Sequence, residues 1–339
     1  MSERKLASIR KITDIIPIEN ADAIEIALVD GWKVVTKKDE YKPGDMCIYC
    51  EIDSFLPIRD EFEFLRKSSY KKMGDTEGFR LRTIKLRGQV SQGLIISINE
   101  LLKYGVSADD VYEGLDVSGM LGIIKYEPPI LAELAGKVKG LFPSFIPKTD
   151  EERVQNLSSE YVSWKDQTFY VTEKLDGSSA TYYIKDGEFG VCSRNLELLE
   201  TEGNTFWKVA RDLDLENKMK SVGINFSIQG ELIGEGIQGN PYKIKGQTVK
   251  FFNLYDIDIK DYYNLEYFEK IIKEEMSLDT VPILDRNFKL PENVEEILKY
   301  ADAKSVLNPT FDREGVVIRS HDRKISFKVI SNKFLLKHK

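Results

Sequence analysis

The fold of this chain is decided by one stretch, Thr172-Glu173-Lys174-Leu175-Asp176-Gly177-Ser178-Ser179. The aromatic and β-branched run before it, residues 168–171, predicts a strand, and so does the run after it, residues 180–184. Lys174 is therefore expected where a strand ends in a glycine turn, a place where a side chain is exposed and still held. Taken alone, Lys-Leu-Asp-Gly more often marks an ordinary hairpin turn than a reactive site. The interpretation therefore depends on the rest of the chain.

Length and composition place the chain among globular proteins with a sizeable core. It has 339 residues, of which 42% are hydrophobic and 31% charged, and this length allows two domains or one large one. The net charge of −7 provides no general basic field. A polyanion would therefore have to bind to a local basic face.

Cysteine usage and the N-terminal sequence favour a reducing compartment. The three cysteines, Cys47, Cys50 and Cys192, are too few and odd in number for a disulfide framework. Cys47 and Cys50 have Cys-x-x-Cys spacing, but without a second pair we expect half-buried structural thiols rather than a metal or redox site. We see no secretory leader and no stretch long enough to span a membrane. We therefore expect a cytoplasmic or nuclear protein that is not secreted.

Residues 1–120 are predicted to form an OB-like β-barrel that binds nucleic acid. Short runs of strand-forming residues are separated by turn signals, of which Asp30-Gly31 between residues 23–29 and 32–36 is a clear hairpin signal. Several short strands at this spacing are typical of a small barrel.

One basic run in this barrel is the candidate nucleic-acid contact. Residues 79–88 mix apolar and basic positions, and one bulge near Thr83 would bring four cations to the same side. Leu81 and Leu86 would then face the opposite side. A solvated charged strand explains the run equally well, but a row of cations beside Phe79 also suits a phosphate backbone with stacked bases. The four candidates are Arg80, Arg82, Lys85 and Arg87.

A connection over residues 121–147 is predicted to lead into a second domain, residues 148–339. A helix is expected to begin within residues 148–153, which offer an N-cap and an acidic first turn. Residues 205–222 carry apolar side chains at helical spacing. Because strand patterns alternate with such helices, we expect an α+β domain of mixed antiparallel sheets and helices.

Six short motifs follow one another in this second domain. They are Lys174 in Glu-Lys-Leu-Asp-Gly, Ser193-Arg194-Asn195, Glu231 in Gly-Glu-Leu, the aromatic strand ending Tyr255-Asp256-Ile257, Glu314 in Arg-Glu-Gly-Val-Val-Ile-Arg, and Lys328. Each alone has an ordinary explanation, such as a solvated acid, a core aromatic or a basic tail. Together, their order and contexts resemble the covalent nucleotidyltransferases, which include polynucleotide ligases and mRNA capping enzymes.

The chain as a whole resembles the fifth family of ATP-dependent RNA ligases, the Deinococcus/Naegleria type, in which a barrel precedes the nucleotidyltransferase (adenylation) domain. The likeness includes residues 86–93, 147–151 and 326–330. The resemblance implies an ATP-dependent RNA ligase that seals 3′-OH RNA ends to 5′-phosphate ends at duplex nicks. The intermediates would be a lysyl-AMP and an adenylylated polynucleotide, and we expect the protein to act as a monomer.

The resemblance also implies a role for each motif. Lys174 would attack the α-phosphorus of ATP, while Glu231 and Glu314 would hold Mg²⁺ or Mn²⁺ through water. Lys328 would neutralise phosphate charge, and Arg194 would contact ribose or an incoming phosphate. Further nucleotide contacts are expected from Lys148, Arg153, Glu173 at the adenine amino group, Asp176, Gly177, and a stacking aromatic that is either Phe252 or Tyr255.

Three questions stay open at the level of sequence. Attack requires a neutral lysine, although free lysine has a pKa of about 10.4; we expect nearby cations, bound metal and exclusion of water to lower it. The last motif has Ser326 where many ligases have lysine, so either Lys328 acts alone or Lys324 substitutes. The two candidate stacking aromatics, Phe252 and Tyr255, lie on opposite faces if the strand alternates regularly.

Two rival functions are also compatible with the motifs. A DNA ligase of the same superfamily would be distinguished by comparing RNA and DNA on the 3′-OH side of a nick. A non-catalytic RNA-binding protein with a ligase-like domain would form no covalent adduct from ATP.

Overall fold

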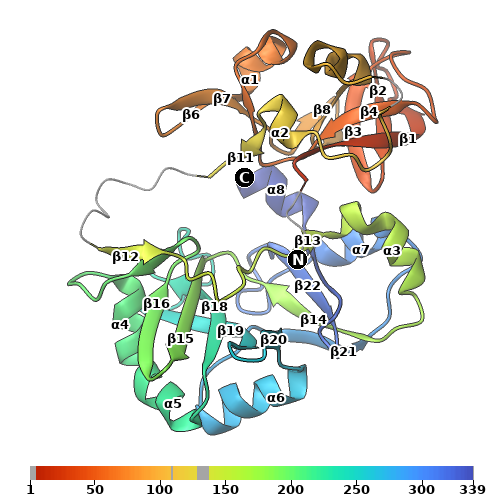
Figure 1. The fold of residues 1–339 in the computed structure, drawn as a ribbon. Helices are drawn as coiled ribbons and strands as arrows, with labels where there is room; N and C mark the ends of the chain where they lie inside the picture. The colour runs from red at the N-terminus through yellow and green to blue at the C-terminus, as the bar shows by residue number, and fades with distance from the viewer. Residues whose placement is uncertain (1–4, 108–109, 128–136, 339) are drawn as a thin grey trace. The chain divides into compact units, whose positions relative to one another are not determined.

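The computed structural model describes residues 5–107, 110–127 and 137–338, and its chain divides into two compact units (Figure 1). The first unit comprises residues 1–130, 154–161 and 335–339, and the second comprises residues 131–153 and 162–334. The first unit thus includes two short segments that lie far along the sequence from residues 1–120. Residues 128–136 of the predicted connection lie outside the described part of the chain.

Two antiparallel sheets form the frame of the first unit. The five-stranded sheet has the order β10-β4-β1-β2-β3, and these strands are Leu94–Ser97, Met46–Cys50, Ala7–Pro17, Ile24–Val29 and Trp32–Lys37. The four-stranded sheet has the order β11-β5-β7-β6, with Ile124–Lys125, Ser54–Pro57, Thr76–Arg80 and Tyr70–Met73. The hairpin predicted at Asp30-Gly31 is confirmed, because Val29 pairs with Trp32 across that two-residue turn.

Short helices and a buried core complete the first unit. The core includes Ile9, Ile48, Leu56, Phe62 and Phe79, all fully buried. The helical segments are Asp60–Leu65 (η1), Arg66–Ser69 (α1), Ile98–Tyr104 (η2), Ser118–Leu121 (α2) and Val154–Leu157 (η5). In the last of these, the Asn156 side chain accepts a hydrogen bond from Trp32 Nε1 and donates one to Glu51 Oε1, both at 2.6 Å. These bonds attach the 154–161 segment to the barrel.

The predicted basic strand consists of two separate elements, so the single bulge expected near Thr83 is wrong. β7 ends at Arg80, and a second ribbon follows, in which β8 (Ile84–Leu86) pairs with β9 (Gln89–Ser91). Arg87 and Gly88 form its two-residue turn with positive φ angles of 46° and 82°, the geometry of a type I′ hairpin. Thr83 is buried and Leu86 is exposed. Because the chain leaves the sheet after Arg80, Leu86 has no core to face.

The three cysteine thiols are free and buried. Burial raises the pKa of Cys47 to about 12, and its Sγ lies 3.4 Å from the Arg10 carbonyl oxygen. Burial disfavours the reactive thiolate. Cys47 and Cys50 were expected to be half buried, and the structure buries both fully. A search of the described helices finds none that is long and apolar enough to cross a membrane.

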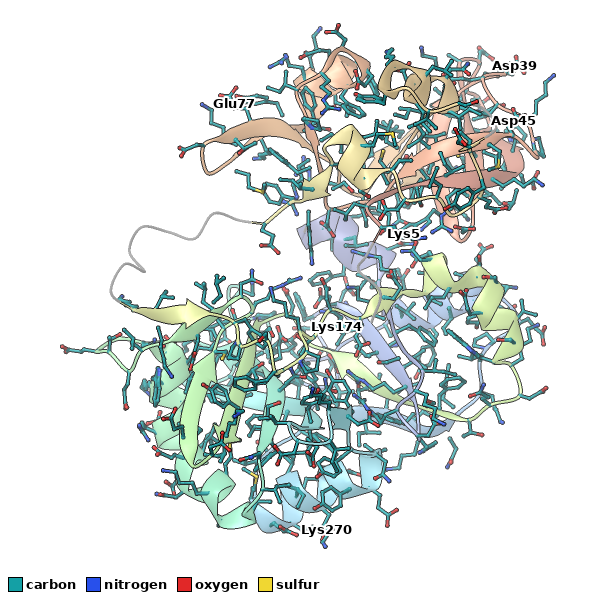
Figure 2. The ribbon with its side chains drawn as sticks, viewed as in Figure 1. Lys5, Asp39, Asp45, Glu77, Lys174 and Lys270 are labelled. Atoms are coloured by element: carbon teal, nitrogen blue, oxygen red, sulfur yellow. The ribbon has the colours of Figure 1, made fainter. Side chains whose placement is uncertain are left out.

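A seven-stranded and a five-stranded sheet form the second unit. The seven-stranded sheet has the order β12-β17-β16-β15-β18-β19-β20, with Val138–Leu141, Leu196–Leu198, Glu188–Cys192, Ser178–Lys185, Phe226–Gly234, Gln247–Asp256 and Asp261–Tyr262. The five-stranded sheet has the order β13-β23-β22-β14-β21, with Glu152–Arg153, Ser326–Ile330, Gly315–Ser320, Phe169–Lys174 and Ile283–Phe288. Lys174, at the end of β14, is labelled in Figure 2. With a barrel unit and a mixed sheet-and-helix unit, the predicted α+β fold is confirmed.

Helices cover one face of the seven-stranded sheet. Trp207, Met219 and Phe268 from these helices share a core with Tyr182 and Phe251 from the sheet. The helices are Thr205–Asp212 (α4), Leu215–Val222 (α5) and Leu265–Glu269 (α6), the last continued by a π-helical turn, Lys270–Glu275. The other helices among the described residues of this region are Ser158–Ser163 (α3), Val294–Ala301 (α7) and Asn332–His338 (α8).

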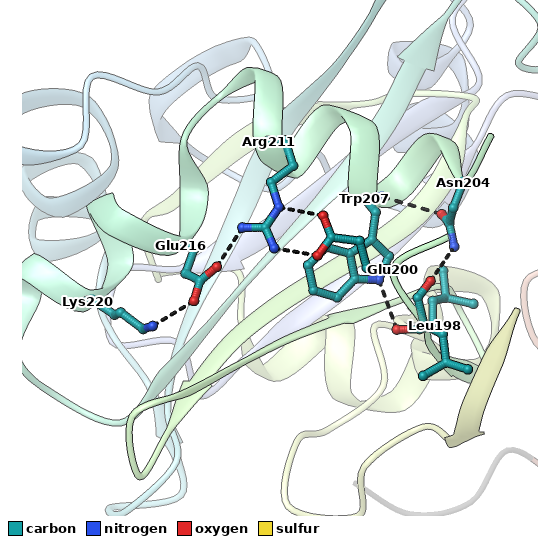
Figure 3. A network of polar contacts seen from close by, with 8 residues as sticks. Leu198, Glu200, Asn204, Trp207, Arg211, Glu216 and Lys220 are labelled. Atoms are coloured by element: carbon teal, nitrogen blue, oxygen red, sulfur yellow. Dashed lines mark hydrogen bonds and ion pairs between the residues drawn. The ribbon is translucent and has the colours of Figure 1, made fainter. Parts of the chain in front are cut away.

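The helical pattern of residues 205–222 is divided into α4 and α5 by Asp214, whose φ of +53° is left-handed. A network of polar contacts surrounds the junction between α4 and α5 (Figure 3). Asn204 caps α4 by accepting hydrogen bonds from the Phe206 and Trp207 amides. Arg211 bridges Glu200 and Glu216. The network links α4 to α5 and to the segment that precedes α4.

Candidate active site

The lysine motif lies where the chain passes from one sheet of the second unit to the other. β14 ends at Lys174 in the five-stranded sheet, and β15 begins at Ser178 in the seven-stranded sheet. This confirms the strand, turn and strand predicted from sequence. Gly177 is required in the turn, because a Cβ there would lie only 2.4 Å from the Leu232 carbonyl oxygen.

A buried carboxylate contacts the lysine directly. Lys174 Nζ lies 2.7 Å from Glu314 Oε2. Glu314 directly precedes β22, whose first residue, Gly315, pairs with Lys174 in the sheet. The Glu314 side chain is 4% exposed and that of Lys174 is 28% exposed. A reactive amine is thus held against an acid while keeping access to solvent.

A second carboxylate comes from the other sheet. Glu231 lies on β18, and its Oε1 accepts a hydrogen bond of 3.0 Å from the Gly177 backbone N–H. Burial raises the pKa of Glu231 to about 7, and Lys174 opposes this rise while Glu314 and Asp176 add to it. Its negative charge is therefore unfavourable in the ligand-free site and would be stabilised by a cation.

The charge state of Lys174 differs from the expectation. Burial lowers its pKa, but Glu314, Glu231 and Asp176 outweigh burial, so the net direction is upward. The prediction that nearby cations lower this pKa is wrong for the ligand-free protein, because the charges that act on Lys174 are acids. The amine is therefore held as an ammonium ion until those acids are neutralised.

A cationic group lies beside the lysine on the same face of the five-stranded sheet. Thr172 pairs with Val317, and Val317 pairs with Lys328, so Lys328 shares the face of Lys174. Lys328 Nζ lies 3.2 Å from Asp150 Oδ1, and Arg194 Nη2 lies 3.3 Å from Asp150 Oδ2. Two predicted site cations therefore share one carboxylate.

Residues 148–153 place two more predicted nucleotide contacts, Lys148 and Arg153, near Lys328 and Arg194. They do not begin the helix that the sequence predicted. Glu152 and Arg153 form β13, which pairs in parallel with Phe327 and Lys328 of β23. Arg153 is thereby buried next to Lys328. Lys148 Nζ donates to Asn195 Oδ1 at 3.0 Å. The predicted cap and acidic residues are locally helix-like, but strand pairing to a distant segment determines the structure.

Arg319 is a buried cation of this face that the sequence analysis missed. Its Nη2 lies 3.0 Å from Glu151 Oε1, its Nη1 donates to Thr172 Oγ1 at 3.2 Å, and its side chain is 2% exposed. Arg319 pairs across the sheet with Ser326, whereas Lys324 is an exposed turn residue near Asp322. The cation beside Ser326 is thus Arg319 rather than Lys324. An arginine near the end of an otherwise apolar strand was the available signal.

A β-bulge in β19 places both candidate aromatics on one face. Asn253 pairs with Gln229 and Phe251 with Gly230, which leaves Phe252 as the extra residue. Phe252 and Tyr255 therefore do not lie on opposite faces, as regular alternation predicted. Phe252 packs beside the lysine turn with Leu175, and the Arg319 guanidinium carbon is 5.8 Å from its ring centroid. Tyr255 packs in a separate cluster with Ile146 and Tyr183.

Glu173, next to the lysine in sequence, points to the opposite face of β14. Its Oε2 accepts a hydrogen bond of 2.8 Å from the Val306 backbone N–H. Its Oε1 is buried and has no hydrogen-bond partner among the described residues. Burial raises the pKa of Glu173, with Ser305, Val306 and Arg313 opposing the rise. The carboxylate is a preformed acceptor that lacks one donor.

The structure separates the four predicted nucleic-acid contacts of the first unit. Arg80 is partly buried, lies 3.5 Å from Asp53 Oδ1, and its guanidinium carbon is 4.3 Å from the Tyr126 ring centroid. Arg82, Lys85 and Arg87 are exposed on or next to the β8–β9 ribbon. These three are exposed cations within six residues of one another in sequence, whereas Arg80 contacts Asp53 and Tyr126.

The donor set suits a divalent cation that keeps part of its water. Across residues 5–107, 110–127 and 137–338, no group of three or more His, Cys, Asp or Glu side chains is arranged to hold a metal directly. Glu314 instead contacts Lys174 directly, and Glu231 is close enough to interact electrostatically with both. Hard cations such as Mg²⁺ bind through one or two carboxylates plus water and phosphate oxygens.

Comparison with known proteins gave matches for both units. Residues 6–98 match a family model described as an OB-fold domain, and residues 167–335 match one described as RNA ligase. The structure of Naegleria gruberi RNA ligase with PPi is similar, with a TM-score of 0.91, 45% identity and 99% of each chain covered. A variant of that ligase with ATP and Mn gives 0.90, 44% and 98% of each chain, and one with AMP and Mn gives 0.91, 43% and 98%. A search of curated proteins found no match.

Proposed function

The chain belongs to the RNA ligase family, and we propose that this ATP-dependent enzyme seals 3′-OH RNA ends to 5′-phosphate ends at nicks in duplex. The observation that carries this proposal is the position of Lys174, in contact with Glu314 and joined to Glu231 through the turn that links both sheets. A lysine so placed can form a covalent nucleotide adduct.

In the first step, Lys174 Nζ would attack the α-phosphorus of ATP. The N–P bond forms, the bond to the bridging oxygen breaks, and pyrophosphate leaves with the electron pair. The ammonium must first lose its proton to solvent, which its contact with Glu314 opposes. A divalent cation held by Glu231 and Glu314 through water would neutralise these acids and the developing phosphate charge.

Cations beside Lys174 would hold the phosphates. Lys328 and Arg194 already converge on one carboxylate, Asp150, which supports their binding a bridging anion in its place. Lys148 and Arg153 belong to the same segment as Asp150 and would add two further cations beside these phosphates.

The adenine base would bind beside the turn. Phe252 is our choice for the stacking residue, because the bulge brings it next to Leu175 while Tyr255 fills a separate core. The Glu173 Oε1 without a partner would accept a hydrogen bond from the adenine amino group. Asp176 and Gly177 form the turn after Lys174, and their backbone would contact the bound nucleotide.

In the later steps the 5′-phosphate of RNA would attack the lysyl-AMP, and the P–N bond would break to give an adenylylated end. The 3′-OH would then attack that end, and AMP would leave. The exposed Arg82, Lys85 and Arg87 would grip the RNA, since a chain of net charge −7 needs a local basic surface. We further propose that the protein acts as a monomer in a reducing compartment, cytoplasm or nucleus, as its free thiols suggest.

Adduct formation and nick sealing together test this proposal. Wild type incubated with α-labelled ATP and magnesium should yield a labelled, acid-labile protein band, and Lys174→Ala should yield none. The wild type should then seal a nick with RNA on its 3′-OH side faster than one with DNA there. Equal rates would favour a DNA-tolerant ligase, and an unlabelled wild type would favour an RNA-binding protein without catalysis.

A further inference from the structure

The loop that follows the Glu231 strand has an unusual backbone. This segment, residues 235–246, joins β18 to β19. Three consecutive residues in it, Gln238, Gly239 and Asn240, have left-handed φ angles of 46°, 71° and 50°. Such a conformation is unfavourable for side-chain-bearing residues. It persists only where the surrounding structure holds it, and it is concentrated near functional sites.

The loop reaches back to the turn behind Lys174. The hydroxyl of Tyr242 accepts a hydrogen bond of 2.6 Å from the Asp176 backbone N–H. Gln238 Nε2 donates to the Gly177 carbonyl oxygen at 3.2 Å, while Glu231 Oε1 accepts from the Gly177 N–H at 3.0 Å. Three side chains thus hold the backbone of this two-residue turn. The loop contributes two of them.

The tyrosine itself is fixed on several sides. Tyr242 is 4% exposed, and its ring packs edge-on against Phe311, with centroids 6.0 Å apart and planes at 79°. The preceding carbonyl, of Pro241, accepts a hydrogen bond of 2.7 Å from Asn308 Nδ2. Burial raises the pKa of Tyr242, so its hydroxyl stays protonated near neutral pH. A rigid, neutral acceptor therefore faces the Asp176 amide.

We propose that Tyr242 is a positioning residue for Lys174, and this inference rests on the proposed role of Lys174 as nucleophile. The Asp176-Gly177 turn sets the distance between the Lys174 amine on one sheet and the Glu231 carboxylate on the other. Tyr242 holds the first amide of that turn, and the strained 235–246 loop delivers its hydroxyl there. The predicted effect is on the rate of adduct formation rather than on ATP binding.

The test compares two tyrosine-to-phenylalanine variants. Tyr242→Phe removes the hydroxyl and keeps the ring. The matched control is Tyr182→Phe, because Tyr182 is fully buried in the same unit and its hydroxyl donates to the Phe206 carbonyl oxygen at 3.4 Å. In single-turnover assays we expect Tyr242→Phe to form the adduct about tenfold more slowly, the effect of one lost hydrogen bond. The ATP concentration for half-maximal rate should stay within about twofold. Tyr182→Phe should match wild type in both.

Amide hydrogen exchange provides a readout that needs no catalysis. Tyr242→Phe should speed exchange at the Asp176 amide, and Tyr182→Phe should leave it unchanged. Wild-type rates of both adduct formation and exchange in Tyr242→Phe would overturn the proposal. If wild type itself forms no adduct, the proposed function fails. Unchanged exchange at the Asp176 amide in Tyr242→Phe would still show that the Tyr242 hydroxyl does not hold this turn. Should Tyr242→Phe fail to fold, Gln238→Ala removes the other contact between the loop and the turn. Slower adduct formation in Gln238→Ala would support a positioning role for the loop, and a wild-type rate would overturn the proposal.

Discussion

At the scale of single residues, Glu231 should make the ligand-free protein less stable as pH rises. Its pKa is raised to about 7 in the folded protein, whereas an unfolded chain has a glutamate pKa of about 4.3. Between these values the folded protein binds more protons than the unfolded chain, so the free energy of unfolding falls as pH rises and levels off above about 7. Urea denaturation of metal-free protein should show this fall. Glu231→Gln should flatten it, and an equal slope in both proteins would contradict the assignment.

Arg319 should matter for stability far more than an exposed arginine. Burial raises the pKa of Glu151, but Arg319 and other cations outweigh it, so the net direction is downward. Arg319→Met leaves that carboxylate without its closest cation and should cost about 3 kcal/mol or more. The matched control, Arg211→Met in the exposed network of Figure 3, should cost less than about 1 kcal/mol. Urea denaturation measures both.

A double variant shows whether the loss in Arg319→Met comes from its ion pair with Glu151 or from its packing on Phe252. Arg319→Met combined with Glu151→Leu should recover most of the loss, because neither charge then remains buried alone. If the double variant were as unstable as Arg319→Met, the loss would come from the packing of Arg319 on Phe252 rather than from the ion pair.

At the scale of elements, the bulge in β19 assigns different roles to two aromatics. Phe252→Ala should raise the ATP concentration for half-maximal adduct formation by about tenfold or more, since stacking on a base contributes about 1–3 kcal/mol. Tyr255→Ala should instead lower the free energy of unfolding by about 3 kcal/mol, because it opens a cavity in a buried cluster. Adduct kinetics and urea denaturation of both variants distinguish these effects. An ATP defect confined to Tyr255→Ala would reverse the assignment.

Local turn chemistry made some elements predictable. The Asp30-Gly31 hairpin and the strand, turn and strand around Lys174 follow from residues within a few positions of each other. Residues 148–153 were misassigned because their capping pattern is local, whereas β13 forms by pairing with β23 about half the chain away. The bulge at Phe252 had no local signal. It depends on how β18 and β19 are registered.

The site was predictable to the extent that its residues belong to ordered motifs. Lys174, Glu231 and Glu314 were named from sequence, and the structure brings Lys174 within reach of both acids. Arg319 and Tyr242 were missed, because their importance comes from a cross-strand position and from a contact with a backbone amide. Tyr242 leaves no mark in the spacing of residues, and the only sign of Arg319 is an arginine in an apolar strand.

At the scale of the whole molecule, the cationic ribbon predicts a separation of reaction steps. Arg82→Ala with Arg87→Ala should slow nick sealing and leave adduct formation near the wild-type rate, since neither residue belongs to the unit that holds Lys174. The RNA affinity of this double variant should also depend less steeply on salt concentration than that of wild type, because fewer phosphates are neutralised. Equal loss of both steps would show that the ribbon does more than grip nucleic acid.

The first unit is assembled from three separate stretches of chain, residues 1–130, 154–161 and 335–339. A recombination event that exchanged only the N-terminal stretch would therefore not transfer the whole first unit. A recombinant that exchanged only residues 1–120 would keep Asn156 from the old parent while receiving Trp32 and Glu51 from the new one. We therefore expect the two units to be inherited together, because exchanging residues 1–120 alone would mismatch Asn156 with Trp32 and Glu51.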